Sequence, residues 1–142
     1  MRFWDSSAIV ALIVDEAGHK DALAALAEDA AMLVWWATPV ECLSALTRRE
    51  REGSLGADAL RTASARLRSL SQEWHEVLPT AALRGVAERM LRVHPLRAAD
   101  ALQLAAAVMA AERDPSSLEF LSLDERLVEA ATKEGFRIDR SA

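Results

Sequence analysis

Residues 1–16 read MRFWDSSAIVALIVDE and place a carboxylate between two apolar segments. The segment that ends at Trp4 has the bulky character of a strand, and the run from Ala8 to Val14 is typical of a first helix. Asp5 and two serines lie at the junction. An Asp or Ser at this position is a common helix cap, but an Asp is also a common ligand for a hard cation. The choice depends on which other carboxylates the fold brings to Asp5.

The alternation of strand and helix continues to the end of the chain. The predicted strands are Met1–Asp5, Met32–Trp36, Glu76–Leu78, Leu118–Ser122 and Arg137–Ile138. The predicted helices are Ser7–Val14, Gly18–Asp29, Pro39–Glu52, Ala57–Ser71, Thr80–Val93, Leu96–Glu112 and Glu125–Glu134, with Gly53 and Gly135 as C-terminal caps. This order predicts an α/β fold in which helices cover both faces of a parallel sheet. Its ligand crevice should lie at the carboxyl ends of the strands.

Length and composition predict one cytoplasmic domain over residues 1–142. The 142 residues are 51% hydrophobic and 27% charged, as expected of a single globular core. Cys42 is the only cysteine, which excludes an intrachain disulfide and indicates a buried apolar residue. No stretch reaches the ~18 apolar residues of a membrane span, and Asp5 interrupts the first apolar run too early for a secretory signal.

Glu41 lies shortly after the second predicted strand. Thr38 and Glu41 have the spacing of a capping box, with Pro39 as the first helical residue. The functional alternative places the Glu41 side chain in the crevice, from the first turn of the helix. The sequence allows either role, or both.

Asp124 follows the fourth predicted strand and also has a capping alternative. Ser122 and Glu125 have capping-box spacing, and Asp124 would favour the positive end of the helix dipole. The functional alternative again places the carboxylate in the crevice.

Asp100 is the acid that local helix chemistry explains least. It lies inside the predicted helix Leu96–Glu112 among Ala and Leu residues, and Asp is a poor residue for a helix interior. A partly buried carboxylate costs several kcal/mol unless it is paired or binds a metal. An exposed ion pair with Arg97 would contribute only about 0.3–0.5 kcal/mol. A role as metal ligand is therefore favoured.

Carboxylates that converge on one crevice repel one another unless a cation lies among them. Oxygen ligands without a cluster of His or Cys favour Mg²⁺ or Mn²⁺. The three histidines, His19, His75 and His94, stand apart from these acids and are predicted to be surface or packing residues.

This pattern resembles the PIN-domain nucleases, and among them the VapC-like toxins of bacterial toxin–antitoxin pairs. The resemblance covers essentially the whole chain. It rests on DSS at 5–7, TPVECLSAL at 38–46, LRAADALQLA at 96–105 and LSLDERL at 121–127, followed by Ala130-Ala131 and Gly135. Ser122 stands where the family often has Thr, which keeps the hydroxyl.

The resemblance implies a three-layer α/β/α sandwich with a mostly parallel central sheet, and a Mg²⁺- or Mn²⁺-dependent endoribonuclease. Asp5 and Asp100 would bind the principal metal. Glu41 and Asp124 would complete the acidic pocket and place the attacking water or a second ion.

The resemblance also implies supporting residues and partners. Ser7 and Ser122 would hydrogen-bond the acids or the substrate phosphate. The substrate would be RNA, a small cognate antitoxin would block the pocket, and the chain would form a homodimer. Trp35, Trp36 and Trp74 are apolar candidates for such contacts, but neighbours on a strand face opposite sides, so at least one of Trp35 and Trp36 belongs to the core.

The net charge of −5 argues against a protein that binds nucleic acid through a basic surface. Four of the 22 acidic residues belong to the candidate site, which leaves 18 against 17 basic residues. RNA would then be attracted by the metal and by local arginines. The candidates are Arg48, Arg49, Arg51 and Arg97, although the segment 48–52 is more typical of a mixed-charge solvated face.

Three other functions compete with a nuclease. A receiver-type signalling domain needs an acidic pair after the first strand and a late Lys after another strand, whereas Lys133 lies within a predicted helix. A haloacid-dehalogenase-like phosphatase needs Asp-x-Asp, and Ser7 occupies the second position. A PIN-like fold kept only as a binding module is the strongest alternative, and the intact acids argue against it.

Overall fold

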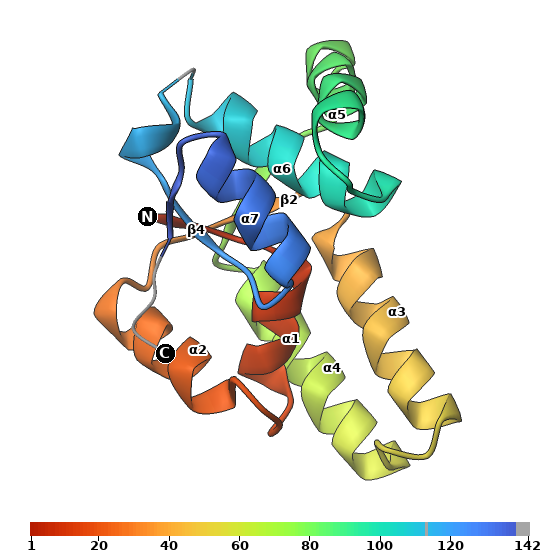
Figure 1. Ribbon diagram of the computed structural model, residues 1–142. Coiled ribbons are helices and arrows are strands. Elements are labelled where there is room, and N and C mark those ends of the chain that lie inside the picture. The colour runs from red at the N-terminus through yellow and green to blue at the C-terminus, as the bar shows by residue number, and fades with distance from the viewer. Residues whose placement is uncertain (113, 139–142) are drawn as a thin grey trace.

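Helices cover both faces of a central sheet in the computed structural model, which describes residues 1–112 and 114–138 (Figure 1). The strands are β1 (Arg2–Trp4), β2 (Met32–Trp35), β3 (His75–Val77), β4 (Glu119–Leu121) and β5 (Arg137–Ile138). All of their pairings are parallel, in the order β3-β2-β1-β4-β5. The predicted parallel sheet and three-layer architecture are confirmed, and each strand bound lies within one residue of its prediction.

The predicted helices are confirmed to within two residues at each end. They are α1 (Ser6–Ile13), α2 (His19–Glu28), α3 (Thr38–Arg51), α4 (Ala57–Ser71), α5 (Ala81–Val93), α6 (Ala98–Ala110) and α7 (Glu125–Lys133). A short 3₁₀ helix at Pro115–Ser117 was not predicted. Gly53 and Gly135 follow α3 and α7 with φ of 82° and 100°, the left-handed conformation expected of C-terminal caps. Within the described ranges, no helix has the length and apolar character needed to cross a membrane.

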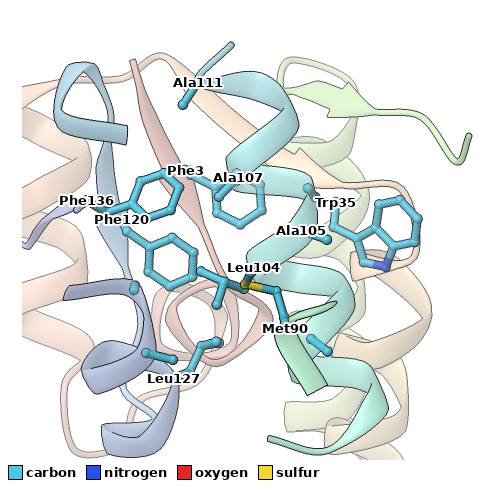
Figure 2. Close-up of a cluster of buried hydrophobic side chains, with 14 of the residues drawn as sticks. Phe3, Trp35, Met90, Leu104, Ala105, Ala107, Ala111, Phe120, Leu127 and Phe136 are labelled. Atoms are coloured by element: carbon cyan, nitrogen blue, oxygen red, sulfur yellow. The ribbon is translucent and has the colours of Figure 1, made fainter. Parts of the chain in front are cut away.

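Adjacent residues of β1 point into two separate cores. Phe3 faces the layer of α5, α6 and α7, where its ring stacks on Phe120 with centroids 5.3 Å apart and Leu104 packs beside them (Figure 2). Trp4 faces the layer of α1 to α4. Both rings are fully buried, and burying a side chain of this size contributes about 1.5–3 kcal/mol. Because successive side chains of β1 are buried on opposite faces of the sheet, β1 is a central strand with a core on each side.

The tryptophans divide between core and surface. Trp35 is 4% exposed and packs with the α5–α6 core, whereas Trp36 is 53% exposed. This confirms that one of the pair belongs to the core. Trp74 is buried as well, in the core on the other face of the sheet. Cys42 is buried on α3, as expected, and burial raises the pKa of its thiol.

The site is positioned by the place of β1 between β2 and β4. The chain leaves β1 toward β2 on one side and reaches β4 on the other, so the direction of winding changes between β1 and β4. Asp5 donates a backbone hydrogen bond of 2.9 Å to the carbonyl of Leu121, which joins the carboxyl ends of these two strands. A ligand crevice is expected at such a switch point.

Candidate functional site

Asp5 directly follows β1 and is the N-cap of α1. Its Oδ2 accepts a hydrogen bond of 3.3 Å from the backbone N–H of Ser7, and the residue is only 3% exposed. The capping role thus belongs to Asp5 itself and not to a following serine. Capping uses one oxygen of the carboxylate, so it does not prevent a second role.

The two oxygens of Asp5 have different surroundings. Oδ2 also accepts hydrogen bonds from the hydroxyls of Ser7 at 2.6 Å and Ser122 at 2.8 Å. Within the described residues, the side-chain hydrogen bond of Oδ1 is a long one of 3.5 Å from Ser6. The orientation of the carboxylate is therefore fixed through Oδ2, which leaves Oδ1 with lone pairs for a ligand.

The two serines join the loop after β1 to the loop after β4. Ser7 donates to Asp5 and accepts from the backbone N–H of Leu123 at 2.9 Å. Ser122 likewise donates to Asp5 and accepts from the N–H of Asp124 at 3.0 Å. Each hydroxyl proton is already used on Asp5, so the 3.2 Å separation of the two serine oxygens is a neighbour contact and not a third bond.

Glu41 lies in the first turn of α3, but the predicted capping box is wrong. The N-cap is Ala37, and no side chain caps this helix. Thr38 is instead the first helical residue, and its fully buried hydroxyl accepts a hydrogen bond of 3.2 Å from Nε2 of Gln103. Glu41 is thereby released from a capping role, and its Oε1 accepts from the hydroxyl of Ser6 at 3.2 Å.

Gln103 is a part of the site that the sequence analysis missed. It is fully buried on α6, and its Nε2 lies 3.4 and 3.3 Å from the two carboxylate oxygens of Glu41. Its Oε1 is buried without a hydrogen-bond partner among the described residues. The available signal was an amide three residues after Asp100, on the same face of an otherwise Ala- and Leu-rich helix.

Asp100 occupies a different position in its helix from the predicted one. Helix α6 begins at Ala98 with Arg97 as N-cap, so Asp100 lies in the first turn and not in the interior. The positive end of the helix dipole favours a carboxylate there. The expected conflict with helix propensity is therefore wrong. Although both residues are described, no ion pair joins Arg97 to Asp100.

Asp124 is the N-cap of α7. Its Oδ1 accepts hydrogen bonds from the backbone N–H groups of Arg126 at 3.0 Å and Leu127 at 3.4 Å. The capping function predicted for this segment is present, but the cap is Asp124 and not Ser122.

The four predicted acids converge at the carboxyl ends of β1 and β4. Glu41, Asp100 and Asp124 line one cavity of about 610 Å³ together with Ser6 and Ser7. Asp5 is buried beside this cavity and is hydrogen-bonded to both of these serines. Residues far apart in the sequence thus meet at one site, where the carboxyl ends of the parallel strands were expected to form a crevice.

Burial and mutual repulsion make these carboxylates hard to ionise together. Burial, followed by repulsion from Asp5 and Asp100, raises the pKa of Glu41 to about 7. Burial, followed by repulsion from Asp124 and Asp5, raises the pKa of Asp100. Burial raises the pKa of Asp5 although its hydrogen bonds act in the opposite direction. The site holds more negative charge than its surroundings neutralise.

The sequence model of the PIN domain family matches residues 2–133. This chain belongs to the PIN domain family. The receiver and phosphatase alternatives are thereby excluded.

Two solved structures share the fold of this PIN domain. A toxin from Mycobacterium tuberculosis, VapC20, described as cleaving the sarcin–ricin loop, superposes with a TM-score of 0.70 at 22% identity over 96% of each chain. FitAcB from Neisseria gonorrhoeae superposes with a TM-score of 0.65 at 14% identity over 97% of this chain and 96% of that one. No curated protein sequence matches this chain.

The donor chemistry of the PIN-domain site suits a hard divalent cation. Every candidate ligand is a carboxylate oxygen. Repulsion among the acids, which adds to burial in raising the pKa values of Glu41 and Asp100, would be relieved by a cation. Within residues 1–112 and 114–138, no three His, Cys, Asp or Glu side chains are arranged to hold an ion as they stand.

The histidines make contacts outside this cavity. His94 is buried with its Nε2 2.6 Å from a carboxylate oxygen of Glu134, and Nδ1 of His19 lies 2.7 Å from the carbonyl oxygen of Ala11. His75 is exposed on β3. None of the three lines the acidic cavity, which agrees with their predicted packing and surface roles.

Proposed function

We propose that this PIN domain is a Mg²⁺- or Mn²⁺-dependent endoribonuclease that acts as a toxin. The observation that carries the proposal is that Glu41, Asp100 and Asp124 line one cavity and Asp5 is buried beside it. The pKa values of Asp5, Glu41 and Asp100 are all raised. Such an arrangement is unfavourable in an empty pocket and favourable around a cation. Selection for stability alone would not assemble it at the switch point of the sheet.

In this proposal Asp5 and Asp100 hold the principal ion. Asp5 would use Oδ1, because Ser7 and Ser122 engage Oδ2. Glu41 and Asp124 complete the pocket and orient the attacking water or bind a second ion. A divalent ion in such a site lowers the pKa of the attacking water and neutralises charge on the phosphoryl group. This chemistry needs no histidine, which suits a cavity without one.

The toxin part of the proposal is supported by the match to the PIN family and by the shared fold with VapC20. A ribosomal RNA stem-loop of the sarcin–ricin type is therefore the first substrate to test. A small cognate antitoxin would inhibit the enzyme by covering the cavity, and the toxin would form a homodimer. Trp36 and Val40 are 53% and 72% exposed, and Val40 lines the cavity, so apolar surface is available for a protein partner there.

The second candidate is a PIN fold without catalysis that only binds RNA or protein. The carboxylate of Asp5 favours the enzyme, because its structural contacts with α1, Ser7 and Ser122 use Oδ2 and leave Oδ1 with lone pairs for a ligand. The two candidates differ in one measurable property, the hydrolysis of RNA.

The test is cleavage of labelled RNA by the purified protein with Mn²⁺, Mg²⁺ or EDTA. We expect cleavage with either metal and none with EDTA. Asp5→Asn and Asp100→Asn should abolish cleavage with the fold retained, since each keeps the side-chain shape and removes the charge. Asp21→Asn, at an exposed position in the first turn of α2, is the matched control. Equal activity in Asp5→Asn, Asp100→Asn and the control would end the metal-site hypothesis.

The partner proposals have separate tests. Co-expression with a small protein encoded beside this chain should yield a complex that no longer cleaves RNA. The mass in solution, measured by light scattering, should correspond to two chains for the isolated toxin. A monomer that cleaves RNA would leave the nuclease in place and overturn the homodimer.

A further inference from the structure

We infer that Arg48, Arg97 and Arg126 form a binding track for the RNA phosphates next to the cleaved one. The inference rests on the proposed function and adds where the substrate backbone runs. It assigns the RNA to one side of the acidic cavity, toward the N-terminal ends of α6 and α7.

A second cavity of about 720 Å³ adjoins the acidic one. The two cavities share Arg48, Asp100, Leu123 and Asp124 in their walls, so they form one continuous trough. Each volume is in the range of about 300–1,000 Å³ that small-molecule ligands occupy. Each cavity is therefore large enough for a nucleotide-sized ligand.

The trough is acidic at one end and basic at the other. Arg97 and Arg126 line only the second cavity, and Arg48 stands at the boundary. Among the acids of the second cavity, Asp100 and Asp124 face the proposed ion. Glu125 is then the one acid left against three arginines in that wall. A polyanion placed with its reacting phosphate at the acids would be attracted into this basic end.

The guanidinium groups of these three arginines have N–H donors available for a ligand, and that of Arg97 acts on Asp100 through its charge alone. Within the described residues, none of them makes a hydrogen bond or an ion pair, and all three residues are exposed. Arg49 differs, because it donates hydrogen bonds of 3.1 and 2.7 Å to the two carboxylate oxygens of Glu16. Arg51 lines neither cavity. The structure therefore selects Arg48 and Arg97 from the arginines that the sequence suggested and adds Arg126.

Phosphodiesters are the chemistry that such a surface recognises. A guanidinium offers paired N–H donors that match two phosphate oxygens, and such contacts position a nucleic acid without reading its sequence. We therefore assign the track to the RNA backbone, with no base preference. Each phosphate contact should contribute about 0.7 to the slope of log affinity against log salt.

The test measures binding and cleavage separately. Binding of a fluorescein-labelled 12-nucleotide RNA is followed by anisotropy in Ca²⁺ at 50 and 200 mM KCl, and a gel verifies that the RNA stays intact. The proteins are wild type, Arg48→Gln, Arg97→Gln, Arg126→Gln and the triple variant. The control is Arg68→Gln, an exposed arginine of α4 that lines neither cavity. Circular dichroism verifies the fold, and cleavage in Mn²⁺ is measured on the same proteins.

The expected result is a graded loss of salt sensitivity. Three contacts predict that wild-type affinity falls about 20-fold between the two salt concentrations, and each single variant should reduce this ratio about threefold. Arg68→Gln should match wild type, and Arg→Lys at the three positions should restore part of the affinity. Wild-type-like binding by the triple variant, or no binding by wild type, would overturn the track. RNA binding that depends on the arginines without any cleavage would support the track and overturn the nuclease. Unchanged cleavage in the triple variant would support the nuclease and overturn the track.

Discussion

The hydroxyl of Ser122 donates a hydrogen bond of 2.8 Å to Oδ2 of Asp5, across 117 positions of sequence. The same hydroxyl oxygen accepts from the backbone N–H of Asp124. One side chain thereby sets the orientation of the acid after β1 and the path of the loop after β4. The serine is therefore a positioning residue, and its hydroxyl is the part that matters.

Replacing Ser122 tests this relationship. Ser122→Ala removes both hydrogen bonds and should lower Mn²⁺ affinity and cleavage rate by about 10- to 100-fold, the usual effect of losing a group that orients a metal ligand. Ser122→Thr retains the hydroxyl and should stay close to wild type. Mn²⁺ affinity is measured by EPR titration, independently of RNA. Equal affinity in the two variants would show that the hydroxyl does not orient Asp5.

Gln103 should hold the pKa of Glu41 down. Its Nε2 donates toward both carboxylate oxygens, which favours the charged form. Gln103→Leu keeps a similar volume and removes the donor, so the pKa of Glu41 should rise above about 7. The titration of the labelled Glu41 carboxyl carbon by NMR, without metal, measures it. Gln72→Leu, at the exposed end of α4, is the control. An unchanged or lower pKa in Gln103→Leu contradicts the assignment.

The metal-free protein should lose stability as the pH rises. The pKa of Glu41 rises from 4.5 to about 7 on folding, so the folded state binds this proton more tightly than the unfolded state does. The stabilisation is complete below about pH 4.5 and is lost as the pH rises through about 7. The Tm of the wild type should therefore fall between about pH 5 and pH 8, and the Tm of Glu41→Gln should fall less over the same range. The pKa values of Asp5 and Asp100 are also raised, so these residues contribute to the same loss of stability with rising pH.

Added Mn²⁺ should oppose this loss. Ionised carboxylates bind the cation more tightly, so the rise in Tm on adding Mn²⁺ should be larger at about pH 8 than at about pH 5. Thermal melts at the two pH values, with and without Mn²⁺, measure the difference. A Tm increase that is independent of pH would indicate that the ion binds elsewhere.

Gly18→Ala should destabilise the protein and disturb the site. Gly18 has φ of 91°, and a Cβ there would lie 3.0 Å from Cδ1 of Leu123, which lines both cavities. The backbone conformation alone costs an L-residue roughly 1–2 kcal/mol. Gly85→Ala is the matched control, because it lies within α5 with open space around it and should stabilise by about 0.5–1 kcal/mol. Urea denaturation measures the free energy of unfolding of both variants. An unchanged value for Gly18→Ala would show that the backbone at this position is not strained by a side chain.

The sequence by itself determined the order and type of the predicted elements and the place of the site. The bulky apolar residues of β1 and the helical periodicity of the segments that follow are local information, because strands and helices differ in residue type and in side-chain period. The rule that parallel strands end at one crevice then placed Asp5, Glu41 and Asp124 together. The 3₁₀ helix at Pro115–Ser117 is too short to produce a periodic signal.

The tertiary structure decided which group each side chain meets. Thr38 looked like a helix cap, but burial against Gln103 moved the cap to Ala37 and left Glu41 facing the cavity. Arg48 and Arg49 are neighbours of one type, yet only Arg49 reaches Glu16. Hydrogen bonds and ion pairs form between side chains that packing brings within about 3 Å, and a linear pattern carries no such distances.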